Sequence, residues 1–461
     1  MLLLGGALMV AVLAGLILPI LAGAFGDSYA RIAALPALLM LGGLFIFNKR
    51  MLLLLVFLLR ASGDIVLEST RVGSGGASLG LGGAINALVI LIAILFVIEK
   101  PKLLPRKAVA AWMIFLAVEA IGVLVSPNKG PAVKAALALC SYFAVFISAF
   151  YVVRKPEDFR FMVRLIVASS IIPVLYGVVV TGLSARGGLA TFRLQSTFGH
   201  PNIFAFYLTL VIALGLYMIK SPAFKLGSFP RIMLAGYGAL LFIMLLLTQT
   251  RSAWVGSFVL FVLYGVVFQR RYLIYILVLC CLALLVPSVQ QRVLDLDSGN
   301  TVATYARLNS FAWRMFLWES ALNWMSGARY LIGYGVEAFP FYSGVFFPLA
   351  GGIQWAAHSV FVQLIFDIGI IGLGTYLAVF YTVLRVLIRF FPQDRLAGTI
   401  LICTLVEYLV MSASDNMLAY LAFNWYFWLV MGMGWSLYFN SEAYRLDPRN
   451  KVRGVRLAGA N

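Results

Sequence analysis

The sequence predicts an all-α polytopic membrane protein with about 12 to 14 transmembrane helices, because apolar runs long enough to cross a bilayer recur from end to end. Hydrophobic residues make up 63% of the 461 residues and charged residues only 11%, whereas an average soluble domain carries about 25% charged residues. A soluble fold cannot bury that much apolar surface. Lipid is therefore expected to surround most of the chain.

Short charged breaks divide the chain into the predicted spans. Residues 2–25 are interpreted as the first span rather than a signal peptide, because they lack a basic start and the run is too long. The third span, residues 51–59, is too short to cross unaided and leads into Arg60 and Asp64, but the alternation of basic segments requires it. The breaks fall near residues 26–31, 48–50, 60–82, 99–107, 127–134, 154–160, 184–201, 220–231, 250–252, 269–271, 290–357, 385–395 and 414–416.

Basic residues predict the orientation of the protein. With a cytoplasmic amino terminus, the seven inward segments, including the tail after Asn440, hold 22 Lys and Arg, whereas the six short outward breaks hold eight. Cytoplasmic loops of membrane proteins carry such an excess. The same rule explains the net charge of +18 without a nucleic-acid partner.

The chain is predicted to have three regions: transmembrane helices over 1–289, a long periplasmic loop over 290–357, and transmembrane helices with a basic cytoplasmic tail over 358–461. All four cysteines lie in apolar runs, so they are expected to be unpaired core residues rather than disulfides or metal ligands. They are Cys140, Cys280, Cys281 and Cys403.

The long loop contains a predicted interfacial helix over residues 305–325. Its apolar residues recur at spacings of three and four, namely Leu308, Phe311, Met315, Trp318 and Leu322. Arg307 and Arg314 are seven residues apart and so share a face, with Trp318 one turn beyond Arg314. The alternative interpretation is a surface helix whose arginines only reach the lipid headgroups.

Three further polar sites fall on the outward side. Arg251, in TQTRSAW, lies in a very short turn, where an arginine is often a lipid-phosphate anchor. Arg193 and Asn202 lie in RLQSTFGHPN, whose last residues also fit an ordinary helix start. His358 opens the span after the long loop, and His200 is the one other histidine. A histidine at a helix start beside arginines is a candidate base, although a lone histidine at such a boundary is more often structural.

Three acids fall inside predicted spans and are candidates for function because a charge in lipid is costly: Glu119, Asp367 and Glu407. Packing against a basic side chain is the alternative. Asp295 and Asp297 form a DxD motif of the kind that holds a divalent metal, but one such pair in a polar loop is common by chance.

The order of these motifs resembles the O-antigen ligase and polymerase superfamily of bacterial membrane glycosyltransferases over residues 160–380. The matching stretches are FGHPN, TQTRSAW, RMFLWESAL, GYGVEAF and HSVFVQLIFDIGIIGL. The resemblance implies a helical architecture like that of class C glycosyltransferases. It also implies transfer of a glycan from undecaprenyl pyrophosphate to an acceptor, either lipid A-core or another lipid-linked glycan, at the periplasmic face of the inner membrane.

The same resemblance gives the site residues their roles. His358 would be the catalytic base, Arg251 and Arg314 would bind the pyrophosphate, and Arg193 is a weaker third pyrophosphate ligand. Asn202, Trp318 and Arg307 are possible supporting residues. No cofactor and no metal are expected, because guanidinium groups already supply the positive charge that the leaving pyrophosphate needs. The competing function is a polytopic transporter or lipid-linked oligosaccharide flippase, which would place polar residues at mid-membrane and carry internal repeats.

Overall fold

The computed structural model describes residues 41–69, 81–184, 192–285 and 308–441, together with 289, 290 and 294. Helices are the only regular elements among these residues, which confirms the all-α fold, and the predicted first span lies outside them. They are α3 (Lys49–Leu59), α4 (Asp64–Ser69), α5 (Leu81–Glu99), α6 (Arg106–Val125), α7 (Lys129–Val152), α8 (Pro156–Ser169), α9 (Ile171–Ser184), α10 (Pro201–Lys220), α11 (Ser228–Leu247), α12 (Arg251–Val267), α13 (Arg271–Leu284), α15 (Ser310–Trp324), α16 (Arg329–Ile332), α17 (Ala338–Phe346), α18 (Val360–Phe390), α19 (Arg395–Ser414) and α20 (Leu421–Asn440).

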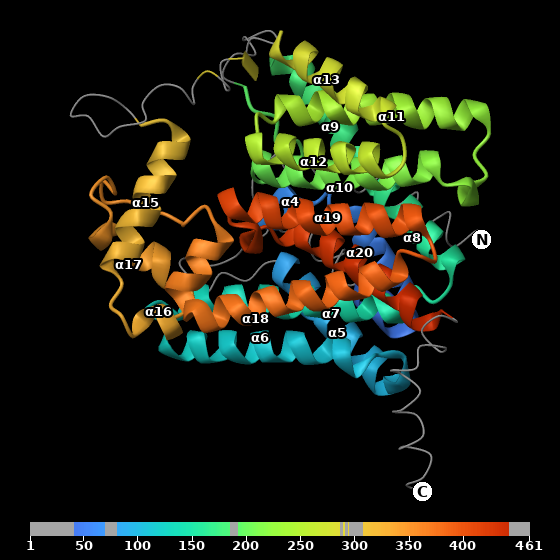
Figure 1. Ribbon diagram of the computed structural model, residues 1–461. Coiled ribbons are helices and arrows are strands. Elements are labelled where there is room, and N and C mark those ends of the chain that lie inside the picture. The colour runs from blue at the N-terminus through green and yellow to red at the C-terminus, as the bar shows by residue number, and fades with distance from the viewer. Residues whose placement is uncertain are drawn as a thin grey trace, which may run out of the picture.

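The long helices lie side by side in one bundle, and α15, α16 and α17 form a separate group at one end of it (Figure 1). Eight helical segments of the described chain are long and apolar enough to cross a membrane, and α12 and α13 are shorter apolar helices. Of the apolar stretch, 83% is buried in α10 but only 17% in α5 and in α11. The protein is therefore a multi-pass membrane protein with α10 near its centre and α5 and α11 against lipid.

Among the described residues, predicted breaks that are assigned to the same side of the membrane meet at the same end of the bundle. At the end where α15 lies, here called the α15 end, Thr197 donates to the Ala61 carbonyl at 2.7 Å. At the opposite end, Tyr217 donates to Asp394 at 3.2 Å. The segments assigned to one side of the membrane thus meet at one end, as the sequence predicts.

The uncertain third crossing is made by α3 and α4 with a turn between them. Lys49 pairs with Glu99 at the opposite end, and the Gly199 amide contacts Asp64 at the α15 end. Arg60, in the turn, is buried and pairs with Asp64 at 2.8 Å, so the break in the apolar run stays inside the protein. The predicted span after residue 160 also differs from expectation, because it is two helices, α8 and α9.

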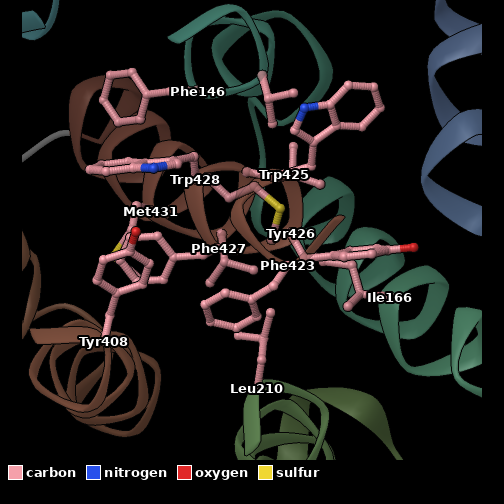
Figure 2. Packing of buried hydrophobic residues seen from close by; sticks show 14 of the residues in the cluster. Phe146, Ile166, Leu210, Tyr408, Phe423, Trp425, Tyr426, Phe427, Trp428 and Met431 are labelled. Atoms are coloured by element: carbon pink, nitrogen blue, oxygen red, sulfur yellow. The ribbon is translucent and has the colours of Figure 1, made fainter. Parts of the chain in front are cut away.

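The core of the bundle is aromatic and centred on α20. Figure 2 shows Trp428 of α20 beside Phe146, Phe427 beside Tyr408, and Trp425 and Tyr426 projecting from the same helix in other directions. Trp428 meets Phe146 edge-on with ring centres 6.1 Å apart, the geometry that aromatic pairs favour. All four cysteines are unpaired, as expected, but Cys280 and Cys281 are exposed on α13 rather than in the core.

Helices α15 to α17, here called the α15–α17 unit, have a small core of their own that includes Leu317, Ala321 and Phe339. Helix α15 starts at Ser310, later than predicted, because the Asn309 side chain caps it by accepting from the amides of residues 311 and 312. The predicted apolar stripe is also divided. Phe311 is 57% and Met315 46% exposed, so this face of the helix is available to the membrane surface.

The α15–α17 unit is joined to α18 at a glycine crossing. Gly333 and Gly369 both have φ of 72°, and a Cβ on either would collide with the backbone of the facing segment. Gly369 interrupts α18, and the Tyr334 and Gly335 amides donate to the carbonyls of Phe366 and Asp367 at 2.9 and 2.7 Å. Glycine alone has both the conformation and the size for this approach.

Candidate functional site

Most of the predicted polar residues gather at the α15 end. The segments that meet there are residues 192–202, the α11–α12 turn, α15, residues 355–359 and the α19–α20 turn. They come from positions more than 200 residues apart in the chain, so only the folded bundle assembles them.

Asn202 is the centre of this assembly, rather than the helix cap that its position suggests. His200 is the N-cap of α10, and its Nδ1 accepts from the Asn202 amide at 3.1 Å. The Asn202 side-chain oxygen accepts from Arg193 at 2.9 Å and from the Thr250 hydroxyl at 3.1 Å. Arg193 also donates to the Thr248 carbonyl at 3.1 Å, so its guanidinium is held in place by two segments.

Asp415 completes the network and was missed from the sequence. One carboxylate oxygen accepts from the Asn202 amide nitrogen at 2.5 Å, and the other accepts from the Tyr420 hydroxyl. Burial raises the pKa of Asp415, whereas the Tyr420 hydrogen bond and the Arg314 charge oppose that rise. The carboxylate therefore fixes the orientation of the Asn202 side-chain amide: the nitrogen faces Asp415 and the oxygen faces Arg193.

Arg314 links the α15–α17 unit to the bundle. Its Nη1 donates to the Ser414 carbonyl at 2.5 Å. Ser414 is the last residue of α19, where carbonyls lack helical partners and the helix dipole is negative. A cation is favourable at this position, and it lies close enough to influence Asp415.

His358 lies between the unit and α18. It has φ of 50°, an uncommon value for a residue other than glycine, and such backbone strain gathers at functional sites. Trp318 donates to the preceding Ala357 carbonyl at 2.5 Å. Burial, with the nearby Arg314 and His200, lowers the pKa of His358 to about 4. The imidazole is therefore neutral at physiological pH and able to accept a proton.

The two histidines and two of the arginines share one electrostatic environment. Protonation of His200 would disfavour protonation of His358, and burial, followed by the charge of Arg193, lowers the pKa of His200. Two cations thus act on two neutral imidazoles, an arrangement suited to binding an anion next to a base.

A comparison with known families identifies part of the chain. The family model described as O-Antigen ligase matches residues 236–377. These residues, here called the ligase-family region, are similar to that family, which supports the resemblance to the O-antigen ligase and polymerase superfamily. The ligase-family region contains TQTRSAW, RMFLWESAL, GYGVEAF and HSVFVQLIFDIGIIGL, whereas FGHPN lies before it. No curated protein matches the chain. The match supports a glycosyltransferase role of the O-antigen ligase or polymerase type.

Of the other predicted site residues in the ligase-family region, the structure describes Arg251 but not Arg307 or the DxD motif. Arg251 is the first residue of α12 and directly follows Thr250, whose hydroxyl donates to Asn202. Arg307, Asp295 and Asp297 lie outside the described residues. Among the described residues, no three His, Cys, Asp or Glu side chains lie together as metal ligands would. Metal independence stays a prediction.

Asp367 of the ligase-family region has a structural partner set. Its carboxylate accepts from the amides of Glu337 and Phe339 at 3.0 and 2.8 Å and from Gln363 at 3.3 Å. Gln363 in turn accepts from Asn416 at 2.5 Å, next to Asp415. The acid that seemed costly in a membrane therefore holds the GYGVEAF segment in place. Glu119 and Glu407 each keep one buried oxygen without a partner among the described residues.

Proposed function

We propose that the protein transfers a glycan from undecaprenyl pyrophosphate to an acceptor sugar, with inversion and without a metal, at the α15 end of the bundle. The excess of basic residues in the opposite segments assigns the α15 end to the periplasm. The acceptor is either lipid A-core or another lipid-linked glycan. The observation that carries the proposal is the gathering of Arg314, Arg193 and neutral His358 from distant segments at one end.

The arginines would bind the leaving pyrophosphate. A guanidinium has five N–H donors, and Ser414 uses one donor of Arg314. Guanidinium groups bind phosphate oxygens with two parallel hydrogen bonds, and they are worth most in a partly dehydrated site. Arg251, at the start of α12, and Arg193, held by Asn202, would add charge from the bundle side.

His358 would take the proton of the acceptor hydroxyl. The hydroxyl oxygen then attacks the anomeric carbon from the face opposite the pyrophosphate, and the carbon–oxygen bond to undecaprenyl pyrophosphate breaks with its electron pair leaving on the phosphate. A base with a pKa of about 4 is weak in the empty site. The anionic donor would offset the Arg314 charge and raise that pKa towards neutrality.

A reconstituted assay tests the proposal with purified protein, undecaprenyl-pyrophosphate-linked glycan and each acceptor. Arg251→Lys and Arg314→Lys should lose most transfer while still accumulating in the membrane, because lysine keeps the charge but not the planar fork. His358→Ala should lose about 10²- to 10⁴-fold in turnover. Transfer should persist in excess chelator.

Three outcomes would contradict these assignments. Full activity of either lysine variant would make that arginine a lipid anchor. Near wild-type transfer by His358→Gln would make His358 a residue that only positions the acceptor, since glutamine cannot take a proton at neutral pH. Loss of activity in chelator that magnesium restores would favour a metal-dependent reaction with Asp295 and Asp297 as candidate ligands.

A further inference from the structure

Two tryptophans of the ligase-family region pack against each other, and one of them, Trp313, lies beside His358. The ring centre of Trp313 lies 4.9 Å from that of Trp355, at an angle of 69°. It lies 6.2 Å from the His358 ring. Trp313 comes from α15 and Trp355 from the segment that leads into α18, and both rings are partly exposed. Trp313 and Trp355 are here called the tryptophan pair.

Helix geometry separates the pair from the cationic side of the site. Trp313 and Arg314 are neighbours on α15, so their side chains leave the helix about 100° apart. Arg314 reaches the Ser414 carbonyl in the bundle. Trp313 instead meets Trp355 and, edge-on, Phe347 at 5.2 Å. Helix α15 thus directs the Arg314 guanidinium towards the bundle and the Trp313 indole towards Trp355, and both residues lie near His358.

The indole N–H groups near His358 are used unequally. Trp318 donates to the Ala357 carbonyl at 2.5 Å, and Trp355 donates to the Ala350 carbonyl at 3.1 Å. These two bonds hold the segment before His358 in place. Within the part of the chain that the structure describes, the indole N–H of Trp313 makes no hydrogen bond. A donor on a partly exposed ring next to the base is placed for a ligand.

We propose that the tryptophan pair is the subsite for the ring of the acceptor sugar, and that the Trp313 N–H donates to one of its hydroxyls. The inference rests on the proposed function. It concerns the acceptor, whereas the arginines would bind the pyrophosphate of the donor. A pyranose ring presents C–H groups on its faces, which pack against an indole, and hydroxyls at its edge, which accept from the N–H. An acceptor held there would have its attacking hydroxyl beside the His358 imidazole.

A different explanation is that the tryptophans only anchor the α15–α17 unit at the membrane surface, where this residue is enriched. Trp324 provides the matched control for that explanation. It lies on the same helix about three turns further on, is 36% exposed, and packs against Tyr334 and Tyr342. Among its described ring contacts, His358 is absent.

The test compares Trp313→Phe with Trp324→Phe in the reconstituted assay, using purified lipid A-core and, separately, the lipid-linked glycan as acceptor. Trp313→Phe keeps a ring and removes the N–H. It should raise the KM for the acceptor about tenfold, the effect of one lost hydrogen bond of ordinary strength, with the donor KM and kcat within twofold. Trp313→Tyr, which restores a hydroxyl donor, should recover part of the loss. Trp324→Phe should change no constant by more than about twofold.

Calorimetric titration with the same two acceptors, without donor, gives a readout that does not need turnover. Equal changes in the two phenylalanine variants, or a change in donor KM instead of acceptor KM, would overturn the subsite. If wild-type protein binds an acceptor through Trp313 but transfers nothing to it, the proposed function fails and the sugar subsite stands. If it transfers glycan and Trp313→Phe matches wild type in both readouts, the subsite fails and the proposed function stands.

Discussion

The bundle and the α15–α17 unit are stabilised differently. The bundle buries a large aromatic core around α20, and the helices at its edge expose apolar side chains to lipid. The unit has short helices and a small core of ten buried residues, one of which, Phe366, comes from α18. It is attached by the rings packed on Phe366 and by polar and backbone contacts, namely the Gly333–Gly369 crossing, the Asp367 carboxylate and the Arg314 contact with α19. The site lies where these two regions meet, so its geometry depends on how the unit is attached to the bundle.

The glycine crossing offers the strongest way to separate the two regions. Gly369→Ala would place a Cβ against the Leu331 carbonyl at φ of 72°. Strain and collision together should cost about 3 kcal/mol or more at this joint. Gly374→Ala is the matched control on the same helix, since nothing lies within 4 Å of its added Cβ.

Limited proteolysis and the transfer assay measure the outcome. Gly369→Ala should expose the α15–α17 unit to protease and abolish transfer, while the bundle stays in the membrane and Gly374→Ala behaves as wild type. If Gly369→Ala keeps a protected unit and full transfer, the crossing does not hold the two regions together.

Asp415 tests the bundle side of the same junction. Asp415→Asn removes the charge that faces Arg314 and replaces an acceptor of the Asn202 amide by a group that also donates. Transfer should fall by about 10- to 100-fold, because a network left partly unpaired costs about 1–3 kcal/mol. Most of the loss should be in kcat and donor KM.

Asp394→Asn provides the control for this change. Asp394 caps the other end of the same helix, α19, by accepting from the Ala397 amide at 2.9 Å, and asparagine caps equally well. Its variant should keep wild-type transfer. Equal losses from the two substitutions would show that Asp415 matters for helix stability rather than for the site.

The smallest effect concerns pH. His358 acts as a base only when neutral, and its lowered pKa of about 4 keeps it neutral in the donor-free protein. As the pH is lowered from 8, kcat/KM for the donor should therefore stay level down to about pH 5. The value of kcat should begin to fall earlier, at a higher pH, because bound pyrophosphate raises the pKa of His358. The difference should be a few-fold near pH 5.5. Identical profiles for kcat and kcat/KM would show that the donor does not lie near His358.

The sequence predicted the elements well because apolar runs and charged breaks report directly on lipid contact. It also placed His358, Arg314 and Arg193 on one side of the membrane. The helix that carries Arg314 was predicted, but its start was set too early, since the Asn309 cap is a weaker signal than the apolar spacing around it.

The pairings within the site could not be predicted. Asp415 lies in a break of three residues without a motif, and its partners Asn202 and Tyr420 come from different helices. The structural role of Asp367 likewise depends on backbone amides some 30 residues before it in the chain, which donate to its carboxylate. Such contacts arise from how helices pack, and spacing along one chain carries no information about them.

The interruption of α18 also bears on how far His358 lies from the centre of the bilayer. At 1.5 Å per residue its 31 residues would reach roughly 46 Å, beyond a hydrocarbon core of about 30 Å. The residues after Gly369 alone span roughly 31 Å, which matches that thickness. The part before Gly369 would measure roughly 13 Å as a helix, so with the later residues across the core we expect His358 to lie near the level of the lipid headgroups. The lipid-linked donor of the proposed function would then meet His358 at that level without leaving the membrane.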